Sequence, residues 1–153
     1  MKKLLLGIAA VCLAGFTFAQ DAPLWMRHSV ISPDGTTIAF TYKGDIYTVP
    51  VAGGRAMQIT TNPAYDTAPV WSPDSKRIAF ASDRMGSLDV YIVAKDGGEP
   101  RRLTTHSGSE TPLAFTDAGH VLFSAGIMPS AEAVVFPSNG QFNQVYRVSV
   151  EGG

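Results

Sequence analysis

The sequence has almost no cysteine and no excess of charge of either sign. Its 153 residues include a single cysteine, Cys12, so neither a disulfide framework nor a cysteine-based metal site is expected. Twelve basic residues stand against 13 acidic ones, and no basic patch is interleaved with aromatic residues, which argues against nucleic-acid binding. What remains is a moderately apolar chain with 15 glycines and 10 prolines, a composition typical of an all-β domain.

Catalytic motifs are lacking too. The chain has no Gly-x-Ser-x-Gly elbow, no His-Glu-x-x-His pair, no Gly-x-Gly-x-x-Gly fingerprint and no P-loop. The three histidines, His28, His106 and His120, fall at different positions of the repeat described below, so a shared metal site is not expected. His106 lies near Ser107 and Ser109, but any serine-rich turn offers such a pair. We therefore predict no catalytic residue, no metal and no cofactor in this chain.

What the sequence does contain is an internal repeat of about forty residues. Residues 30–40 have the sequence Val-Ile-Ser-Pro-Asp-Gly-Thr-Thr-Ile-Ala-Phe. Residues 70–80 have a very similar sequence, and a weaker copy spans 113–123. In each turn, proline presets φ, aspartate bonds back to its own backbone, and glycine tolerates the exit geometry. β-branched and aromatic residues follow, so each copy predicts a hairpin with apolar arms.

Each hairpin is followed by a third apolar strand, at 45–49, 89–93 and 144–148, and then by a Gly-Gly turn. Four short strands per repeat indicate one blade of a β-propeller. We predict an all-β fold, a partial β-propeller of about three four-stranded antiparallel blades, at about 29–69, 70–112 and 113–153. Residues 88–93 are apolar on both faces, which predicts a strand packed between neighbouring blades.

Three blades do not close a propeller, which takes roughly four to eight. A three-blade arc would leave two sheet faces uncovered. We therefore expect the chain to be the N-terminal part of a longer polypeptide, with closure by oligomerisation as the alternative.

Residues 1–19 are predicted to be a secretory signal peptide, and residues 20–153 the incomplete propeller. Lys2 and Lys3 precede an uncharged apolar run, and Thr17 and Ala19 place small residues at −3 and −1 of a cleavage site. This predicts a periplasmic, envelope or secreted protein with no stable membrane span after cleavage; an uncleaved anchor is the alternative.

Two further segments carry structural predictions. In the lead-in, Trp25 and Met26 are expected to pack under the first blade or to pair as an extra strand. The third copy is lengthened by about twelve residues relative to the second, within residues 125–143. Its apolar triplet Val134-Val135-Phe136 predicts an additional hairpin or a cover over a neighbouring blade, with a substrate-facing loop as the alternative.

The second copy carries a family resemblance. Its segments Trp71-Ser72-Pro73-Asp74, Ile78-Ala79-Phe80, Ser82-Asp83-Arg84, Asp89-Val90-Tyr91, Gly97-Gly98 and Leu103-Thr104 resemble the WD-like Ser-Pro-Asp-Gly propeller repeat. That repeat occurs in tricorn-type serine peptidases, in TolB of the bacterial envelope and in dipeptidyl-peptidase-type propellers. Because enzymes and non-enzymes share it, the resemblance implies fold more strongly than activity.

The tricorn type is the closer match, because the first copy begins almost directly after the signal peptide, where TolB-like proteins place a separate α/β domain. The resemblance implies further propeller, PDZ-like and serine peptidase domains in the same polypeptide. The chain would then be a non-catalytic propeller that gates or binds peptide or unfolded-protein substrates for proteolysis. The alternatives are a TolB-like, protein-binding envelope scaffold without enzymatic activity, and a glycan-binding propeller.

Arg84 is the one candidate substrate-binding residue. Its guanidinium suits a carboxylate such as a peptide terminus in the propeller channel. The alternative interpretation is structural: Asp83 caps the turn, and the stem of Arg84 covers an apolar blade edge. The resemblance favours the structural interpretation, because Ser-Asp-Arg recurs in such blades.

Overall fold

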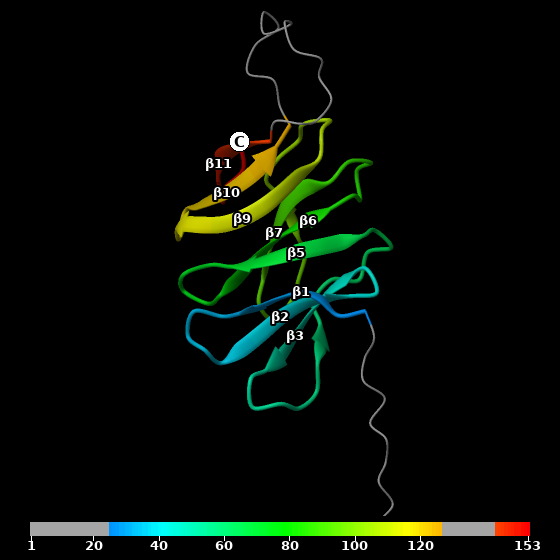
Figure 1. Ribbon diagram of the computed structural model, residues 1–153, viewed down its shortest axis with the longest axis vertical. Helices are drawn as coiled ribbons and strands as arrows, with labels where there is room; N and C mark the ends of the chain where they lie inside the picture. The colour runs from blue at the N-terminus through cyan, green and yellow to red at the C-terminus, as the bar shows by residue number, and fades with distance from the viewer. Residues whose placement is uncertain (1–24, 127–142) are drawn as a thin grey trace, which may run out of the picture.

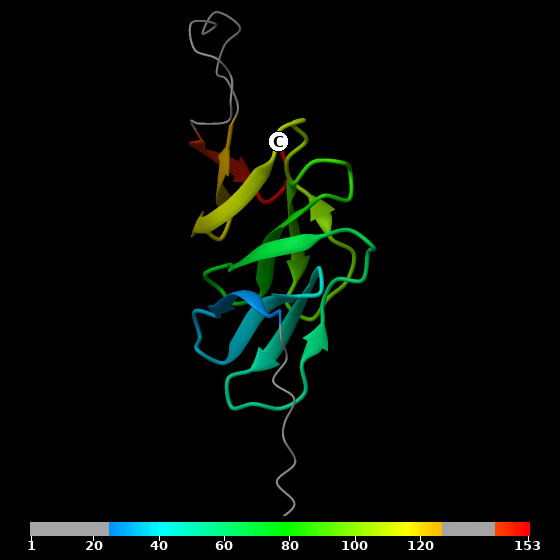
Figure 2. The same ribbon diagram turned by 45° about the vertical axis from the view of Figure 1, so that its right-hand side comes forward.

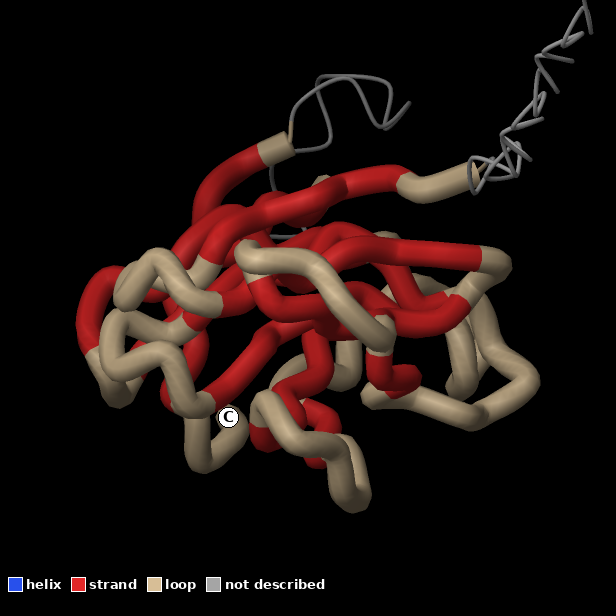
Figure 3. The backbone as a smooth tube through the Cα atoms, turned by 90° about the horizontal axis from the view of Figure 1, so that it is seen from below, coloured by secondary structure: helices blue, strands red, loops and turns tan. Residues whose placement is uncertain are grey.

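The computed structural model describes residues 25–126 and 143–153 (Figure 1). The predicted signal peptide and most of the predicted insertion, including Val134-Val135-Phe136, therefore lie outside the described residues. The regular secondary structure in these two ranges consists of β-strands alone (Figure 3). In that part of the chain, no helix is long and apolar enough to cross a membrane.

The strands form three antiparallel sheets, each built from consecutive strands of the chain. In the first sheet, β1 (Arg27–Ile31), β2 (Thr37–Tyr42), β3 (Asp45–Pro50) and β4 (Met57–Gln58) follow in that order. The second sheet repeats this order with β5 (Asp66–Trp71), β6 (Arg77–Ser82), β7 (Asp89–Ala94) and β8 (Arg101–Arg102). The third holds β9 (Glu110–Asp117), β10 (His120–Ala125) and β11 (Gln144–Ser149), with β10 in the middle.

The three sheets succeed one another along the long axis of the molecule, and their first strands β1, β5 and β9 lie side by side (Figures 1 and 2). This arrangement confirms the prediction of an all-β partial propeller. The repeat seen in the sequence begins near the end of each first strand, so the second and third sheets start at Asp66 and Glu110, ahead of the recognisable motif.

The Ser-Pro-Asp turn is held by its own side chains. The Ser72 hydroxyl donates to Asp74 Oδ1 at 2.5 Å, and the Lys76 amide donates to the same oxygen at 3.1 Å. Ser75 has φ of 58°, at the position that Gly35 fills with φ of 72° in the first copy. The Ser75 hydroxyl accepts the Asp34 amide proton at 3.1 Å and so ties the first turn to the second.

The third turn is one residue shorter than the others. Phe115 pairs with Val121 in the register in which Trp71 pairs with Ile78. Residues 117 and 120 pair directly, and the Asp117 carboxylate accepts the Gly119 amide proton at 2.6 Å. The third copy looks weaker in the sequence because it uses this tighter turn.

Two apolar cores lie on the two faces of the middle sheet. Ile78, Phe80 and Tyr91 pack towards the first sheet, in a cluster with Ile46 and other side chains. The alternate residues Ala79, Val90 and Ile92 pack towards the third sheet, in a cluster with Val121, Phe123 and Val148. The first five residues of β7 are buried, which confirms the prediction of a strand packed on both faces.

The lead-in differs from the sequence-based expectation. Trp25 is 69% exposed and Met26 is 50% exposed, so they do not pack under the first blade. The Arg27 guanidinium lies 5.7 Å from the Trp25 ring centroid, and β1 begins at Arg27. Trp25 and Met26 precede β1 and belong to no strand, so they do not pair as an extra strand either. The backbone has positive φ at Trp25 and at His28, which is not strand geometry, and a local apolar pattern does not reveal this.

Candidate functional site

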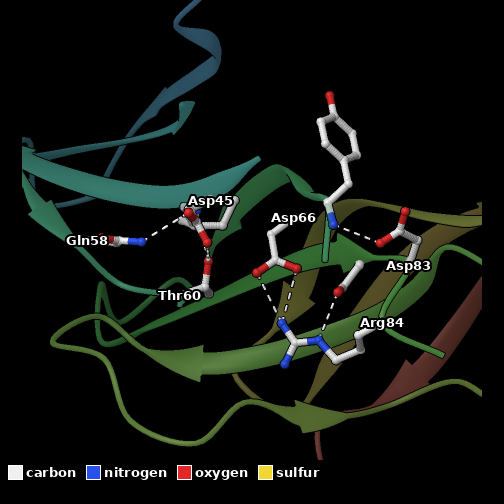
Figure 4. Close-up of polar contacts among 9 residues, drawn as sticks. Asp45, Gln58, Thr60, Asp66, Asp83 and Arg84 are labelled. Carbon is white, nitrogen blue, oxygen red and sulfur yellow. Dashed lines mark hydrogen bonds and ion pairs between the residues drawn. The ribbon is translucent and has the colours of Figure 1, made fainter. Parts of the chain in front are cut away.

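Arg84 lies in the loop after β6 and points back at the start of β5 (Figure 4). Its Nη2 lies 3.1 Å from both carboxylate oxygens of Asp66, and its Nε donates to the Ser82 hydroxyl at 2.8 Å. Its guanidinium carbon stands 4.5 Å from the Tyr91 ring centroid and 5.6 Å from that of Phe80. The guanidinium is therefore clamped between a carboxylate and a pair of aromatic rings.

Burial decides what this arrangement does. The side chain of Asp66 is fully buried and that of Arg84 is 11% exposed, so each charge depends on the other. Asp83 accepts the Tyr65 amide proton at 2.7 Å, which holds the chain entering β5 against the loop after β6. In this structure Arg84 and Asp83 make contacts within the second blade, to Asp66 and to the Tyr65 amide. Binding of a substrate carboxylate by Arg84 stays a prediction.

A second carboxylate stands at the junction of the first two blades. Asp45 accepts from the Gln58 amide at 3.0 Å and from the Thr60 hydroxyl at 3.5 Å (Figure 4). Partial burial raises the pKa of Asp45, and the nearby negative charge of Asp66 raises it further. The Thr60 hydroxyl also accepts the Ile46 amide proton at 3.0 Å, so the group fastens the end of one blade to its own third strand.

The junction of the second and third blades repeats this pattern with different residues. Asp89 is fully buried and forms an ion pair with Arg102 at 2.8 Å. The Thr104 hydroxyl accepts the Val90 amide proton at 2.9 Å, as Thr60 does for Ile46. Burial raises the pKa of Glu110, while a hydrogen bond with Thr104 acts in the opposite direction.

The structure does not bring the three histidines together. His28 and the Thr67 hydroxyl are hydrogen-bonded at 3.1 Å, between the first strands of two sheets. His106 Nδ1 accepts the Gly108 amide proton at 2.9 Å within its own turn, and His120 pairs with Asp117 at 3.0 Å. In the described ranges, no three histidine, cysteine or acidic side chains gather in a way that could hold a metal ion.

A shallow apolar groove crosses the first strands of all three sheets. It has a volume of about 430 Å³ and receives Val30 and Ile31 from β1, Val70 and Trp71 from β5, and three side chains of β9. Ile31 is 58% exposed and Leu113 is 48% exposed, a high exposure for large apolar side chains. The Trp71 indole donates to the Val30 carbonyl at 3.2 Å, so the groove floor is fixed across two sheets.

Sequence reasoning missed this groove and the role of Glu110. The groove joins residues that lie about forty positions apart, and only the side-by-side placement of β1, β5 and β9 reveals it. Glu110 could have been found by aligning the residues that begin each first strand, because it occupies the place of Asp66. The recognisable turn motifs begin after these positions, so the motifs alone do not align them.

Comparison with known proteins adds a family model and individual relatives. A model described as the tricorn protease N-terminal beta propeller domain matches residues 23–153. Tricorn protease homolog 1 of Streptomyces coelicolor is 35% identical over 102 residues, which is 66% of this chain and 9% of that protein. The uncharacterized peptidase YuxL of Bacillus subtilis is 30% identical over 129 residues, which is 83% of this chain and 20% of that protein.

Among solved structures, a putative TolB from Agrobacterium tumefaciens superposes with a TM-score of 0.64 at 22% identity, covering 80% of this chain and 45% of that one. This likeness concerns the fold. The chain spans about a tenth to a fifth of the length of the two curated relatives.

Proposed function

Because the chain belongs to the family of tricorn protease N-terminal β-propeller domains, we propose that it is the non-catalytic propeller segment of an exported, tricorn-like serine peptidase. In this role it binds or gates peptide and unfolded-protein substrates on their way to a catalytic domain of the same polypeptide. The signal peptide at 1–19 and the periplasmic or extracellular location belong to the same proposal.

The apolar groove across β1, β5 and β9 is the observation that carries this proposal. An unfolded peptide differs from a folded protein in exposing apolar side chains, and the groove offers matching surface at Ile31 and Leu113. Because its walls come from three sheets, one extended segment can contact all three blades at once. Such binding is steric and apolar, and it selects unfolded chains without any chemistry in this segment.

The test separates passage through the propeller from catalysis. In the full-length protein, Leu113→Lys is expected to lower kcat/KM for a long unfolded substrate by about tenfold. A charged side chain in the apolar groove should weaken substrate binding by about 1.4 kcal/mol, which corresponds to this factor. Turnover of a short chromogenic peptide should not change. The control is Met85→Lys, which introduces the same charge at an exposed methionine outside the groove.

Two outcomes would contradict the proposal. Equal losses on long and short substrates would place the effect of Leu113→Lys on folding or catalysis. Unchanged rates on both would show that peptides do not use the groove. Export is tested separately: N-terminal sequencing of the secreted or periplasmic protein should begin at Gln20, and retention of Met1 in the cytoplasm would overturn it.

A binding scaffold without catalysis is the second candidate, and the fold likeness to TolB favours it. The two functions differ in one measurement. A full-length protein that binds envelope proteins, hydrolyses no peptide and does not react with serine-directed inhibitors would be a scaffold.

A further inference from the structure

All three blades carry the same stacked pair of aromatic rings between their second and third strands. The ring centroids are 5.6 to 5.9 Å apart and the planes are inclined by 20° to 29°, in the pairs Phe40–Tyr47, Phe80–Tyr91 and Phe123–Tyr146. The strand register is the same in each case, because these residues are direct partners across the ladder. The blades can therefore be compared position by position.

In the second blade this aromatic pair holds a guanidinium. Arg84 stacks on Tyr91 and Phe80, and Asp66 at the start of β5 neutralises its charge. Asp66 is the ladder partner of Ser82, two residues after Phe80. The protein thus already contains one complete guanidinium site, made of a buried carboxylate beside two stacked rings.

The third blade has the carboxylate and the rings at the same positions. Glu110 begins β9 and is the ladder partner of Ala125, two residues after Phe123, so it takes the place of Asp66. Glu110 is 1% exposed, and its Oε2 has no hydrogen-bond partner among the described residues. A buried carboxylate oxygen without a partner is costly, and a charged hydrogen-bond donor such as a guanidinium would satisfy it.

The chain supplies no arginine of its own at the corresponding position. Two residues after Ala125, where the second blade has Arg84, the sequence has Ile127. The sequence from Gly126 to Tyr146 contains no lysine, arginine or histidine. Arg102 forms its ion pair with Asp89 at 2.8 Å, so its charge is already matched by another carboxylate.

A pocket opens at this place. Its volume is about 400 Å³, and its lining includes Thr104, His106, Glu110, Phe123, Tyr146 and Arg147. Arg147 is exposed, and among the described residues no ion pair joins it to Glu110. This volume is within the range of small-molecule sites and accommodates an arginine side chain with part of its backbone. The second blade shows that such a site accommodates a guanidinium, because the guanidinium of Arg84 lies there between the equivalent carboxylate and rings.

We propose that this third-blade pocket binds the guanidinium of an arginine side chain of a peptide, with Glu110 as its counter-ion and the Phe123–Tyr146 pair as its stacking surface. A planar guanidinium suits both partners, since it bonds a carboxylate through its edge and stacks through its face. The peptide as the source of the arginine rests on the proposed function, whereas the guanidinium chemistry rests on the pocket alone. The site would favour arginine-containing substrates.

The experiment compares two peptides that differ only in arginine and its uncharged analogue citrulline. Binding to the full-length protein, treated with a serine-directed inhibitor, is followed by fluorescence anisotropy. The arginine peptide is expected to bind about tenfold more tightly than the citrulline peptide, and a lysine peptide should bind less tightly than the arginine one. Glu110→Gln, which keeps the shape of the side chain, should abolish the difference between arginine and citrulline.

The matched control is Asp66→Asn, which removes the equivalent carboxylate in the blade where Arg84 is the partner. It should lower stability and leave the ratio of arginine to citrulline affinity unchanged. Arginine amide is the second probe: it should raise the melting temperature of the wild type and not that of Glu110→Gln. This second measurement needs no peptide binding.

The outcomes distinguish the two proposals. If both peptides bind equally well, the guanidinium pocket is wrong and the peptide-binding function stands. If arginine amide stabilises the protein through Glu110 while no peptide binds, the pocket stands and the proposed function fails. If neither probe binds and Glu110→Gln destabilises the protein as Asp66→Asn does, an arginine from elsewhere in the polypeptide fills the pocket, and the proposal of a peptide ligand is overturned.

Discussion

At the level of single residues, acidic side chains at equivalent positions of the blades have different partners. Asp66 and Glu110 begin corresponding strands and are both buried, yet only Asp66 has a guanidinium bonded to it. Asp45 and Asp89 begin the third strands of their sheets. Asp45 accepts hydrogen bonds from an amide and a hydroxyl group, whereas Asp89 forms an ion pair with Arg102. The repeat therefore fixes where the acids are, and each blade fixes how its acid is compensated.

Removal of Arg84 should be strongly destabilising. Arg84→Met leaves the fully buried Asp66 without its counter-charge, and the expected loss is about 3–5 kcal/mol in the free energy of unfolding, measured by urea titration. Adding Asp66→Asn should restore part of that loss, because no charge then stays buried alone. Arg101→Met is the control, since its partner Glu151 is largely exposed; a loss as large as that of Arg84→Met would contradict this explanation.

At the level of elements, the Ser-Pro-Asp turn is a self-contained unit. The Ser72 hydroxyl lowers the pKa of Asp74 by donating to its carboxylate, and the Lys76 amide lowers it further. Asp34 is held by Ser32 and Thr36 in the same way, and its pKa is also lowered. Both carboxylates are more stable as anions in the folded protein than in the unfolded chain.

Replacing the turn carboxylate should therefore have a pH-dependent effect. Because the folded-state pKa of Asp74 lies below its unfolded value, the stabilisation is complete above the unfolded pKa and is lost as the pH falls through the folded pKa. Asp74→Asn should unfold at a lower temperature than the wild type at about pH 7, and the gap should close towards about pH 2. Asp34→Asn should follow the same profile, whereas a gap that is constant with pH would mean that the charge is not involved.

At the level of the whole molecule, stability resides between the sheets. The alternation of side chains along β6 and β7 divides the apolar residues into two clusters on opposite faces of the middle sheet. Two hydrogen bonds cross the interface of the first and middle sheets, between Trp71 and Val30 and between Thr67 and His28. Across the other interface, the Arg77 guanidinium donates to the Ala118 carbonyl. The middle sheet is therefore the element on which both neighbours depend.

Substitutions in different clusters should be additive. Ile46→Val and Ile92→Val each remove one buried methyl group, with an expected cost of about 0.5–1.5 kcal/mol. Their double mutant should equal the sum within about 0.5 kcal/mol, because the middle sheet separates them. The comparison is Ile46→Val with Ile78→Val, which share one cluster and should couple; coupling of Ile46 with Ile92 instead would show that the two cores act as one.

The sequence predicted the fold well and the site poorly. The hairpins around Pro33 and Pro73 and the double-sided burial of β7 follow from local patterns, since turn residues and apolar periodicity act over a few positions. The sequence singles out Arg84 as a candidate, but its partner Asp66 lies 18 residues away, and no local pattern connects the two. Trp25 was misplaced, because its exposure depends on how the chain enters β1.

By itself, the sequence determined that this chain folds as successive antiparallel sheets of three or four strands, because turn chemistry and strand periodicity are encoded within each repeat. Tertiary structure alone decided which side chains meet across the repeats: the groove over β1, β5 and β9, the pairing of Arg84 with Asp66, and the pocket beside Glu110. The physical reason is distance along the chain. Contacts within a hairpin are fixed by neighbours, whereas contacts between blades exist only after the sheets have packed face to face.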